Sequence, residues 1–230
     1  MIISVYLLVF ILGACTISFL KVIAHDYPQI SLTRRSHCDR CFRILRWYEI
    51  IPIIGYFIVH GKCSSCKNQL DFENPLQEFV GSLFLCITIY QNDWIYLPFF
   101  IMLIVLSFSD YFYGYVYPIF YLLSLPTIIM LFPQLHLLPA ILIYLSLFLL
   151  SKRYSLGLGD IEVMSLIGLL FETNFFLNTV LIACTFCLLQ YSLHKKRSFR
   201  FIPYLTIATG ITYMIFSFKI LAKSFPVLTN

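Results

Sequence analysis

Two aspartates lie at the ends of apolar segments, where acidic side chains are uncommon. Asp160 follows Gly157 and Gly159 and precedes the apolar segment 161–171, while Asp110 ends the apolar segment 94–109. An acid at the edge of a membrane segment is a functional-site hypothesis. Two carboxylates that share one proton provide a base that activates water and an acid that protonates a leaving amide. The pair is therefore predicted to hydrolyse a peptide bond, with Gly157 and Gly159 letting the backbone turn tightly beside Asp160.

Each acid also has a purely structural interpretation. Asp160 stands at the start of an apolar run, where a carboxylate is typical of a helix N-terminus. Considered alone, it is better explained as such a capping residue. The interpretation as a catalytic pair depends on both acids lying at one depth in the membrane. Asp39, Glu49 and Glu73, in a polar stretch near the N-terminus, could attract a basic segment of a substrate, but solvated surface charges are the commoner explanation for them.

Four cysteines form two pairs in that polar stretch. Each pair has the Cys-x-x-Cys spacing of a zinc ribbon, in which four thiolates close a tetrahedron; the residues are Cys38, Cys41, Cys63 and Cys66. The alternatives are two disulfides or four unconnected thiols. A reducing cytoplasmic location counts against disulfides. We therefore predict a structural zinc ion, because a closed four-thiolate site leaves no open position for substrate and supplies folding energy to a short loop.

The composition is that of an integral membrane protein. Of the 230 residues, 60% are hydrophobic and only 12% are charged, whereas soluble domains carry about 25% charged residues. The mean hydropathy is +0.86. The net charge of +5 does not indicate nucleic-acid binding, because the basic residues fall into a few blocks between apolar runs. We interpret residues 1–23 as a first span that is retained, since they lack a basic start and a small-residue cleavage site.

The apolar segments predict an all-α polytopic membrane protein with about eight transmembrane helices. These segments are 1–20, 76–90, 94–109, 118–131, 137–150, 161–171, 175–193 and 201–218. Two of them, 137–150 and 161–171, are shorter than the roughly 17 residues that a span usually needs. Six spans with a re-entrant pair are therefore the alternative. The polar stretch between the first two spans is large enough for a small extramembrane domain.

The basic residues predict the orientation. With the N-terminus outside, 14 of the 16 Lys and Arg residues fall in cytoplasmic segments, as the positive-inside rule requires. The four-cysteine stretch is then cytoplasmic. Asp110 ends the third span and Asp160 begins the sixth, so both acids lie at the cytoplasmic side of the membrane. This common depth favours the catalytic pair over two separate capping residues.

The order of these motifs resembles that of the prepilin peptidases, the type IV leader peptidases of bacteria. The resemblance covers most of the chain. The segments that carry it are Arg35-Ser36-x-Cys38-x-x-Cys41, Trp47-Tyr48-Glu49-Ile50-Ile51-Pro52, Gly61-Lys62-Cys63-x-x-Cys66, Asn74-Pro75-Leu76-Gln77-Glu78-Phe79, Gly157-Leu158-Gly159-Asp160 and Phe201-Ile202-Pro203-Tyr204-Leu205 with Gly210. The cysteine pairs followed by Gly-x-Gly-Asp, in this order, are specific to that family.

The resemblance implies a plasma-membrane aspartic endopeptidase with Asp110 and Asp160 as catalytic residues. It implies cleavage of prepilin or pseudopilin leaders after a glycine at the cytoplasmic face. Many members also methylate the new N-terminus with S-adenosylmethionine as cofactor. The compact length is similar to that of competence-type members, which implies a DNA-uptake pseudopilus as the context, beside type IV pili and type II secretion. The domains expected are a first helix (1–23), a zinc loop (24–74) and a transmembrane peptidase domain (75–230).

Two other functions fit parts of the sequence. A transporter would use the acids to carry protons or cations, with the zinc ribbon as a regulatory module, and would place acids near mid-membrane within an internal repeat. Neither acid is near the middle of a span, and the sequence shows no repeat. A catalytically inactive assembly factor would use the ribbon to hold partners. Its distinguishing property would be that prepilin leaders remain uncleaved.

Overall fold

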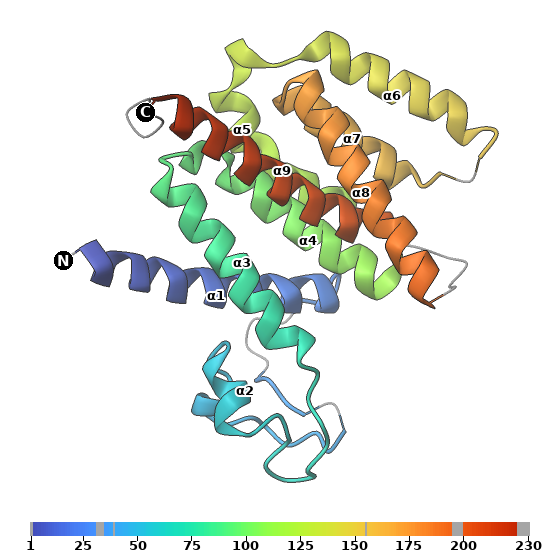
Figure 1. The fold of residues 1–230 in the computed structure, drawn as a ribbon. Helices are drawn as coiled ribbons and strands as arrows, with labels where there is room; N and C mark the ends of the chain where they lie inside the picture. The colour runs from blue at the N-terminus through green and yellow to red at the C-terminus, as the bar shows by residue number, and fades with distance from the viewer. Residues whose placement is uncertain (1, 31–34, 39, 155, 195–199, 225–230) are drawn as a thin grey trace. The chain divides into compact units, whose positions relative to one another are not determined.

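In a computed structural model, the described residues are 2–30, 35–38, 40–154, 156–194 and 200–224. Within these ranges the fold is all-helical, and the sheet-type pairing consists of two isolated bridges in the four-cysteine loop. The chain forms two compact units, residues 1–94 and 95–230 (Figure 1). The predicted division at residues 23 and 74 stays a prediction. Arg34 and residues 195–199, which belong to the predicted cytoplasmic basic blocks, lie outside the described residues, as does the acidic Asp39.

The first unit consists of two crossing helices and the four-cysteine loop, residues 27–72. Helix α1 (Ile2–Asp26) packs against α3 (Glu73–Tyr90), and the loop between them holds the short helices η1 (Trp47–Glu49) and α2 (Ile54–Ile58). The helices approach closely because glycines face the partner helix. A Cβ on Gly13 would lie 3.1 Å from Ser82 Cα, and one on Gly81 would lie 2.8 Å from Ile17 Cδ1.

A polar contact fixes the loop-side ends of α1 and α3. The Lys21 ammonium group donates hydrogen bonds to the side-chain oxygens of Asn74 and Gln77, the latter over 2.9 Å. Glu78 accepts a hydrogen bond of 2.7 Å from the backbone N–H of Ile53, which ties the loop to α3. The two helices therefore hold both ends of the four-cysteine loop at one place.

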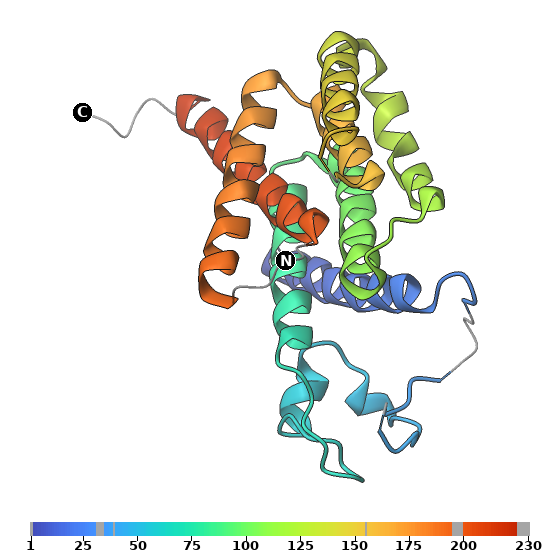
Figure 2. The same ribbon diagram turned by 90° about the vertical axis from the view of Figure 1, so that its right-hand side faces the viewer.

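The second unit is built around α4 (Leu97–Tyr113). Leu103, Val105 and Leu106 on this helix are fully buried. Helix α4 packs against η3 (Pro118–Ser124), α5 (Leu125–Met130) and α9 (Phe201–Ser224). Figures 1 and 2 show α6 (Leu137–Ser151) alongside α7 (Leu158–Leu170), and α8 (Thr173–His194) alongside α9. The remaining elements are the short helices η2 (Trp94–Tyr96) and η4 (Phe132–Gln134).

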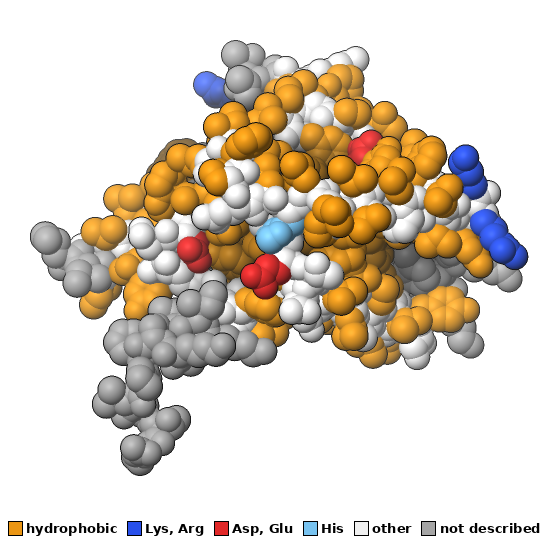
Figure 3. Space-filling view, turned by 90° about the horizontal axis from the view of Figure 1, so that it is seen from above, with side chains coloured by type: hydrophobic (Ala, Val, Ile, Leu, Met, Phe, Trp, Pro, Cys, Tyr) orange, Lys and Arg blue, Asp and Glu red, His pale blue; other side chains and the backbone are white. Residues whose placement is uncertain are grey.

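Each apolar segment that the sequence marks as a span contains a helix or a helical segment. Three helices are long and apolar enough to cross a membrane: Ile3–Asp26, Trp94–Tyr113 and Thr173–Leu193. The segments Pro118–Met130, Leu137–Ser151 and Phe201–Ser217 are shorter and apolar. Hydrophobic side chains cover most of the face seen in Figure 3, with Lys and Arg at its edges. An all-helical fold with three candidate membrane spans is thus confirmed for the described residues, whereas the number of crossings stays a prediction.

Candidate active site and candidate metal centre

Asp110 lies in the last turn of α4 and is 8% exposed. One reason that α4 ends here is Gly114, which adopts the left-handed conformation (φ 65°) and donates its N–H to the Asp110 carbonyl over 2.8 Å. Ser109 then donates a hydrogen bond of 2.8 Å to the carbonyl of Tyr115, which folds the following connection back toward the helix. The local sequence therefore places the Asp110 side chain at a buried helix end.

The Asp110 carboxylate meets the start of α9. The backbone N–H of Ile202, in the first turn of α9, donates a hydrogen bond to this carboxylate. The Oδ2 atom of Asp110 is buried and has no hydrogen-bond partner among the described residues. A buried carboxylate oxygen without a partner is uncommon and needs an explanation. One oxygen of Asp110 is thus held in place, while the other is left for a further group.

Asp160 lies in the first turn of α7, three residues after the N-cap Gly157. The backbone N–H of Gly157 donates a hydrogen bond to its carboxylate, which is the acidic half of a capping box. The capping interpretation of Asp160 is therefore confirmed as a local interaction. Capping is not the only interaction of this side chain, because the charge of Asp110 also acts on the Asp160 carboxyl group.

Gly159 brings α7 to the connection that follows Asp110. A Cβ at this position would lie 2.7 Å from Val116 Cγ2, which is closer than real side-chain contacts. Because valine has a stiff side chain, that space cannot be made by a simple rotation. Gly159 thus lets the start of α7 pack directly on the residues between α4 and η3. This packing brings Asp160 within reach of the charge of Asp110, which is 50 residues earlier in the sequence.

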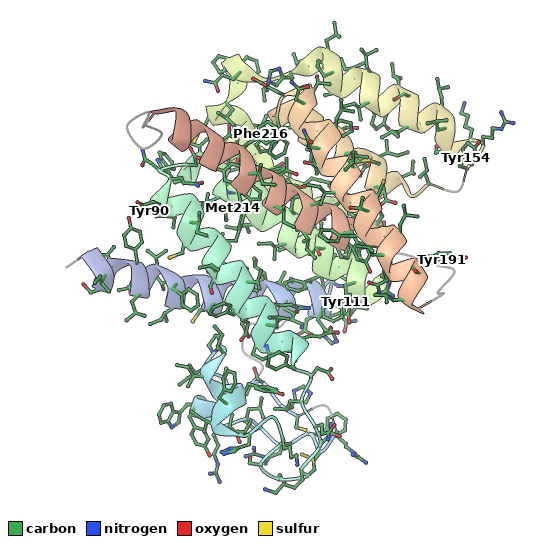
Figure 4. The ribbon with its side chains drawn as sticks, in the orientation of Figure 1. Tyr90, Tyr111, Tyr154, Tyr191, Met214 and Phe216 are labelled. Atoms are coloured by element: carbon green, nitrogen blue, oxygen red, sulfur yellow. The ribbon has the colours of Figure 1, made fainter. Side chains whose placement is uncertain are left out.

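Arg200 is a charged group that sequence reasoning missed. Its guanidinium lies over the Tyr111 ring, 6.0 Å from the centroid, and its positive charge acts on Asp110. Figure 4 labels Tyr111 at the end of α4. The sequence presents Arg200 only as the last member of a basic block. The available signal is its position directly before the first residue of α9, where the segment must meet α4.

The four cysteines of the first unit form one cluster. Their sulfur atoms all lie within 4.8 Å of one another, with 3.8 Å between Cys38 Sγ and Cys66 Sγ and 3.9 Å between Cys41 Sγ and Cys63 Sγ. Four sulfurs at about 2.3 Å from a tetrahedral zinc ion are about 3.8 Å apart. All four are free thiols, and these separations are far longer than a disulfide bond of about 2.05 Å. The geometry fits a four-thiolate zinc site.

The two cysteine pairs have the same backbone conformation. In each, the N–H of the first cysteine bonds to the carbonyl five residues later, Arg43 for one and Asn68 for the other. The residue after each second cysteine, Phe42 or Lys67, has a positive φ of 55° or 57°. Backbone N–H groups of Cys66 and Ser65 donate to the Cys63 sulfur and lower the pKa of its thiol to about 6. These two turns therefore bring the four sulfur atoms together in one cluster, as a metal site requires.

The interpretation of Glu49 as a solvated surface charge was wrong. Its side chain is 3% exposed, and both carboxylate oxygens accept hydrogen bonds of 2.8 Å from Arg43 Nη2. The Arg46 N–H and the Ser64 hydroxyl donate to it as well. Although desolvation opposes ionisation, these hydrogen bonds lower the pKa of Glu49 to about 2. The carboxylate thus links residues beside the first cysteine pair to Ser64, which lies within the second.

Two protein families match successive parts of the chain. The bacterial peptidase A24 N-terminal domain matches residues 11–92, and the type IV leader peptidase family matches residues 97–192. No solved structure shows significant similarity to the chain.

Curated relatives match parts of the chain. A Prepilin leader peptidase/N-methyltransferase of Myxococcus xanthus is 33% identical over 89 residues, which are 38% of this chain and 27% of the relative. A protein with the same name from Vibrio cholerae is 26% identical over 40% of this chain and 41% of its own length. Another from Bacillus subtilis is 41% identical over 20% of this chain and 18% of its own length. The matched segments are therefore less than half of each of these relatives. With the two family matches spanning most of residues 11–192, the chain belongs to the type IV leader peptidase family.

Proposed function

We propose that the protein is a membrane aspartic endopeptidase that removes the leader from prepilins or pseudopilins. The observation that carries the proposal is that the charge of Asp110, at the end of α4, acts on Asp160, at the start of α7, while one buried Asp110 oxygen has no partner among the described residues. Family membership supports it, and the relatives are named prepilin leader peptidase/N-methyltransferase.

The chemistry proposed for the pair needs no further side chain. One carboxylate takes a proton from water as that water attacks the peptide carbonyl, and the other carboxylic acid gives a proton to the departing amide. Because neighbouring carboxyl groups titrate together, the pair is best treated as a single unit with two macroscopic steps. Ile202 donates a hydrogen bond to the Asp110 carboxylate and Gly157 donates one to the Asp160 carboxylate, while Asp110 Oδ2 has no partner among the described residues and would be left for water or substrate.

The substrate class follows from membrane electrostatics. A prepilin has a short basic leader followed by an apolar helix. The positive-inside rule holds the leader in the cytoplasm and the helix in the bilayer. The proposed orientation, with the N-terminus outside, places the active site at the cytoplasmic face, where the peptide bond after the leader's glycine would arrive.

The four cysteines are proposed to hold a structural zinc ion. A closed set of four thiolates gives the ion no open position, so its contribution is the folding energy of the loop. The methyltransferase part of the relatives' names supports a second activity, S-adenosylmethionine-dependent methylation of the new N-terminus. The context proposed is a competence pseudopilus, a type IV pilus or type II secretion.

The test is co-expression with a prepilin, followed by mass spectrometry of the substrate's N-terminus. The wild type should release the leader after a glycine, and Asp110→Asn and Asp160→Asn should each leave the substrate uncleaved. Glu172→Gln removes an exposed acid at the start of α8 and should cleave normally. If either aspartate variant cleaves at the wild-type rate, the pair does not carry the activity.

The same spectra report on the other proposals. A mass increase of one methyl group on the new N-terminus would support methylation, and its absence would argue for a peptidase alone. An uncleaved substrate with well-folded wild-type protein would favour the transporter or the inactive assembly factor. Zinc content should fall when any one of the four cysteines is replaced by serine, and an unchanged content would refute the metal site.

A further inference from the structure

The four-cysteine loop exposes large apolar side chains outside any membrane helix. Trp47 is 78% exposed and Ile44 is 54% exposed, and Ile50 is also exposed. On α1, exposed apolar side chains are explained by a helix that lies in lipid. The loop has no such explanation, and an exposed apolar patch on a folded segment marks an interaction site.

These side chains surround a groove with a positive rim. The groove has a volume of about 730 Å³ and is lined by Arg35, Ile44, Arg46, Trp47, Tyr48 and Ile50. We call Arg35, Ile44, Arg46, Trp47 and Ile50 together the aromatic–basic face. Arg46 Nη1 donates a hydrogen bond of 2.9 Å to the Tyr48 hydroxyl, and the Trp47 and Tyr48 rings meet edge to face at 5.7 Å. An arginine and an indole ring are thus presented together at the surface.

The charge of this part of the loop is positive. Residues 35–50 contain four arginines and two acids, Asp39 and Glu49. Glu49 is buried and already bound to Arg43, so this pair contributes no net charge to the surface. Arg35 and Arg46 are both exposed. The aromatic–basic face therefore combines cationic and aromatic groups, and none of the five residues that form it is acidic.

The loop is also tied closely to a membrane span. Arg35 follows Asp26, the last residue of α1, by nine residues, which limits its distance from the end of the span to about 30 Å. Tryptophan favours the headgroup region of a bilayer, because its ring is apolar and its N–H is polar. Arginine favours anionic headgroups, which it binds through charge and hydrogen bonds.

We propose that the aromatic–basic face binds the anionic phospholipid surface beside α1. Trp47, Ile44 and Ile50 enter the headgroup region, while Arg35 and Arg46 contact lipid phosphates. The proposal needs α1 to cross the membrane and does not depend on peptidase activity. It gives the loop a fixed height at the bilayer surface, in addition to the fold that its cysteines support.

The experiment uses Trp47 as its own reporter. The chain has two tryptophans, so Trp94→Phe leaves Trp47 as the single tryptophan, which can be excited selectively over the tyrosines. The full-length variant is placed in nanodiscs of phosphatidylcholine with or without phosphatidylglycerol, using lipids brominated near the top of the acyl chains. We expect bromine quenching of Trp47 to be about twofold stronger with phosphatidylglycerol. High salt should reduce this difference, because it screens the arginines.

A matched pair of charge changes tests specificity. Arg35→Gln with Arg46→Gln should bring quenching with phosphatidylglycerol down to the phosphatidylcholine level. Lys62→Gln with Lys67→Gln removes the same charge from the second cysteine turn and should leave quenching unchanged. Zinc content, measured for every variant, shows that the loop remains folded. Equal effects of the two pairs would overturn the proposal.

Quenching by acrylamide in water distinguishes the other occupants. If Trp47 is reached by acrylamide and not by bromolipids, the face is open to solvent. If it is protected from both, protein covers it, either another part of this chain or a second copy. Either result overturns the proposal, as does lipid quenching that is independent of phosphatidylglycerol.

Discussion

At the scale of single residues, two side chains decide whether the proposed site can form. Gly159 is required because Val116 occupies the space that a Cβ would need, and Asp110 keeps one oxygen unpaired because Ile202 binds only the carboxylate's other side. Both effects depend on close contacts between segments that are distant in the sequence. Small changes at these positions should therefore affect catalysis more than folding.

Gly159→Ala should reduce leader cleavage by about tenfold to a hundredfold, because the added methyl group pushes the start of α7 away from Val116 and displaces Asp160. Cleavage is measured on purified protein with a prepilin substrate. The double variant Gly159→Ala with Val116→Ala removes the clash and should recover most of the rate. Failure of this rescue would show that Gly159 acts through something other than its contact with Val116.

Glu49→Gln should lower the stability of the four-cysteine loop by about 1–3 kcal/mol at neutral pH, because an amide cannot accept all the hydrogen bonds that Arg43, Arg46 and Ser64 donate. Thermal unfolding together with zinc retention against a chelator measures it. Glu73→Gln, an exposed acid at the start of α3, should change stability by less than about 0.5 kcal/mol.

The advantage of Glu49 over Gln should also depend on pH. The ordinary pKa of a glutamate is 4.5, and the folded loop lowers the pKa of Glu49 to about 2. The folded state therefore prefers the ionised form. This contribution is complete above pH 4.5 and is lost as the pH falls toward 2. The stability difference between wild type and Glu49→Gln should hold from pH 7 to 5 and shrink below it. A difference that grows on acidification would contradict this assignment.

At the scale of elements, the start of α9 has a role that its apolar sequence does not reveal. Its first-turn N–H at Ile202 binds Asp110, and Arg200, immediately before the helix, lies over Tyr111 on α4. The end of one helix is thus fastened to the beginning of another by a backbone hydrogen bond and a cation–π contact. This junction positions Asp110 as much as α4 does.

Arg200→Gln should lower kcat for leader cleavage by roughly tenfold, with little change in KM, because α9 would hold the Asp110 carboxylate less firmly. Arg200→Lys should retain most of the activity, since an ammonium group also binds an aromatic face. Arg153→Gln removes an exposed arginine after α6 and serves as the matched control. A rise in KM with normal kcat would instead place Arg200 in substrate binding.

At the scale of the whole molecule, charge distribution governs the orientation in the membrane. Of the 16 Lys and Arg residues, 14 fall in segments that lie on one side when the predicted spans alternate. The described helices agree with the predicted apolar segments. The side of the membrane on which each connecting segment lies can therefore be tested one segment at a time. The orientation matters for function, because it decides on which side a prepilin leader would meet Asp110 and Asp160.

Reporter fusions should show the N-terminus outside. A fluorescent protein fused after His194 should be fluorescent, because that position is expected in the cytoplasm. One fused after Asn92 should be dark, and alkaline phosphatase at the same two positions should give the reverse result. The opposite pattern at both positions would invert the topology and remove the proposed match between leader and active site.

The sequence by itself determined the local features. The apolar segments predicted helices because a chain in lipid must satisfy its backbone hydrogen bonds within each segment. Cys38-x-x-Cys41 and Cys63-x-x-Cys66 predicted the thiol cluster because tight turns need only neighbouring residues. Charge blocks predicted an orientation. The acids at the segment ends were visible too, although Asp160 alone was better explained as a capping residue.

Only the tertiary structure decided which distant groups meet. That Asp110 and Asp160 interact follows from the packing of Gly159 on Val116, and the contacts of Arg200 and Ile202 follow from the approach of α9 to α4. Glu49 was misjudged for the same reason, because its burial depends on Arg43 and Ser64. Hydropathy and spacing report on near neighbours in the chain, whereas burial and pairing depend on contacts that the folded backbone alone creates.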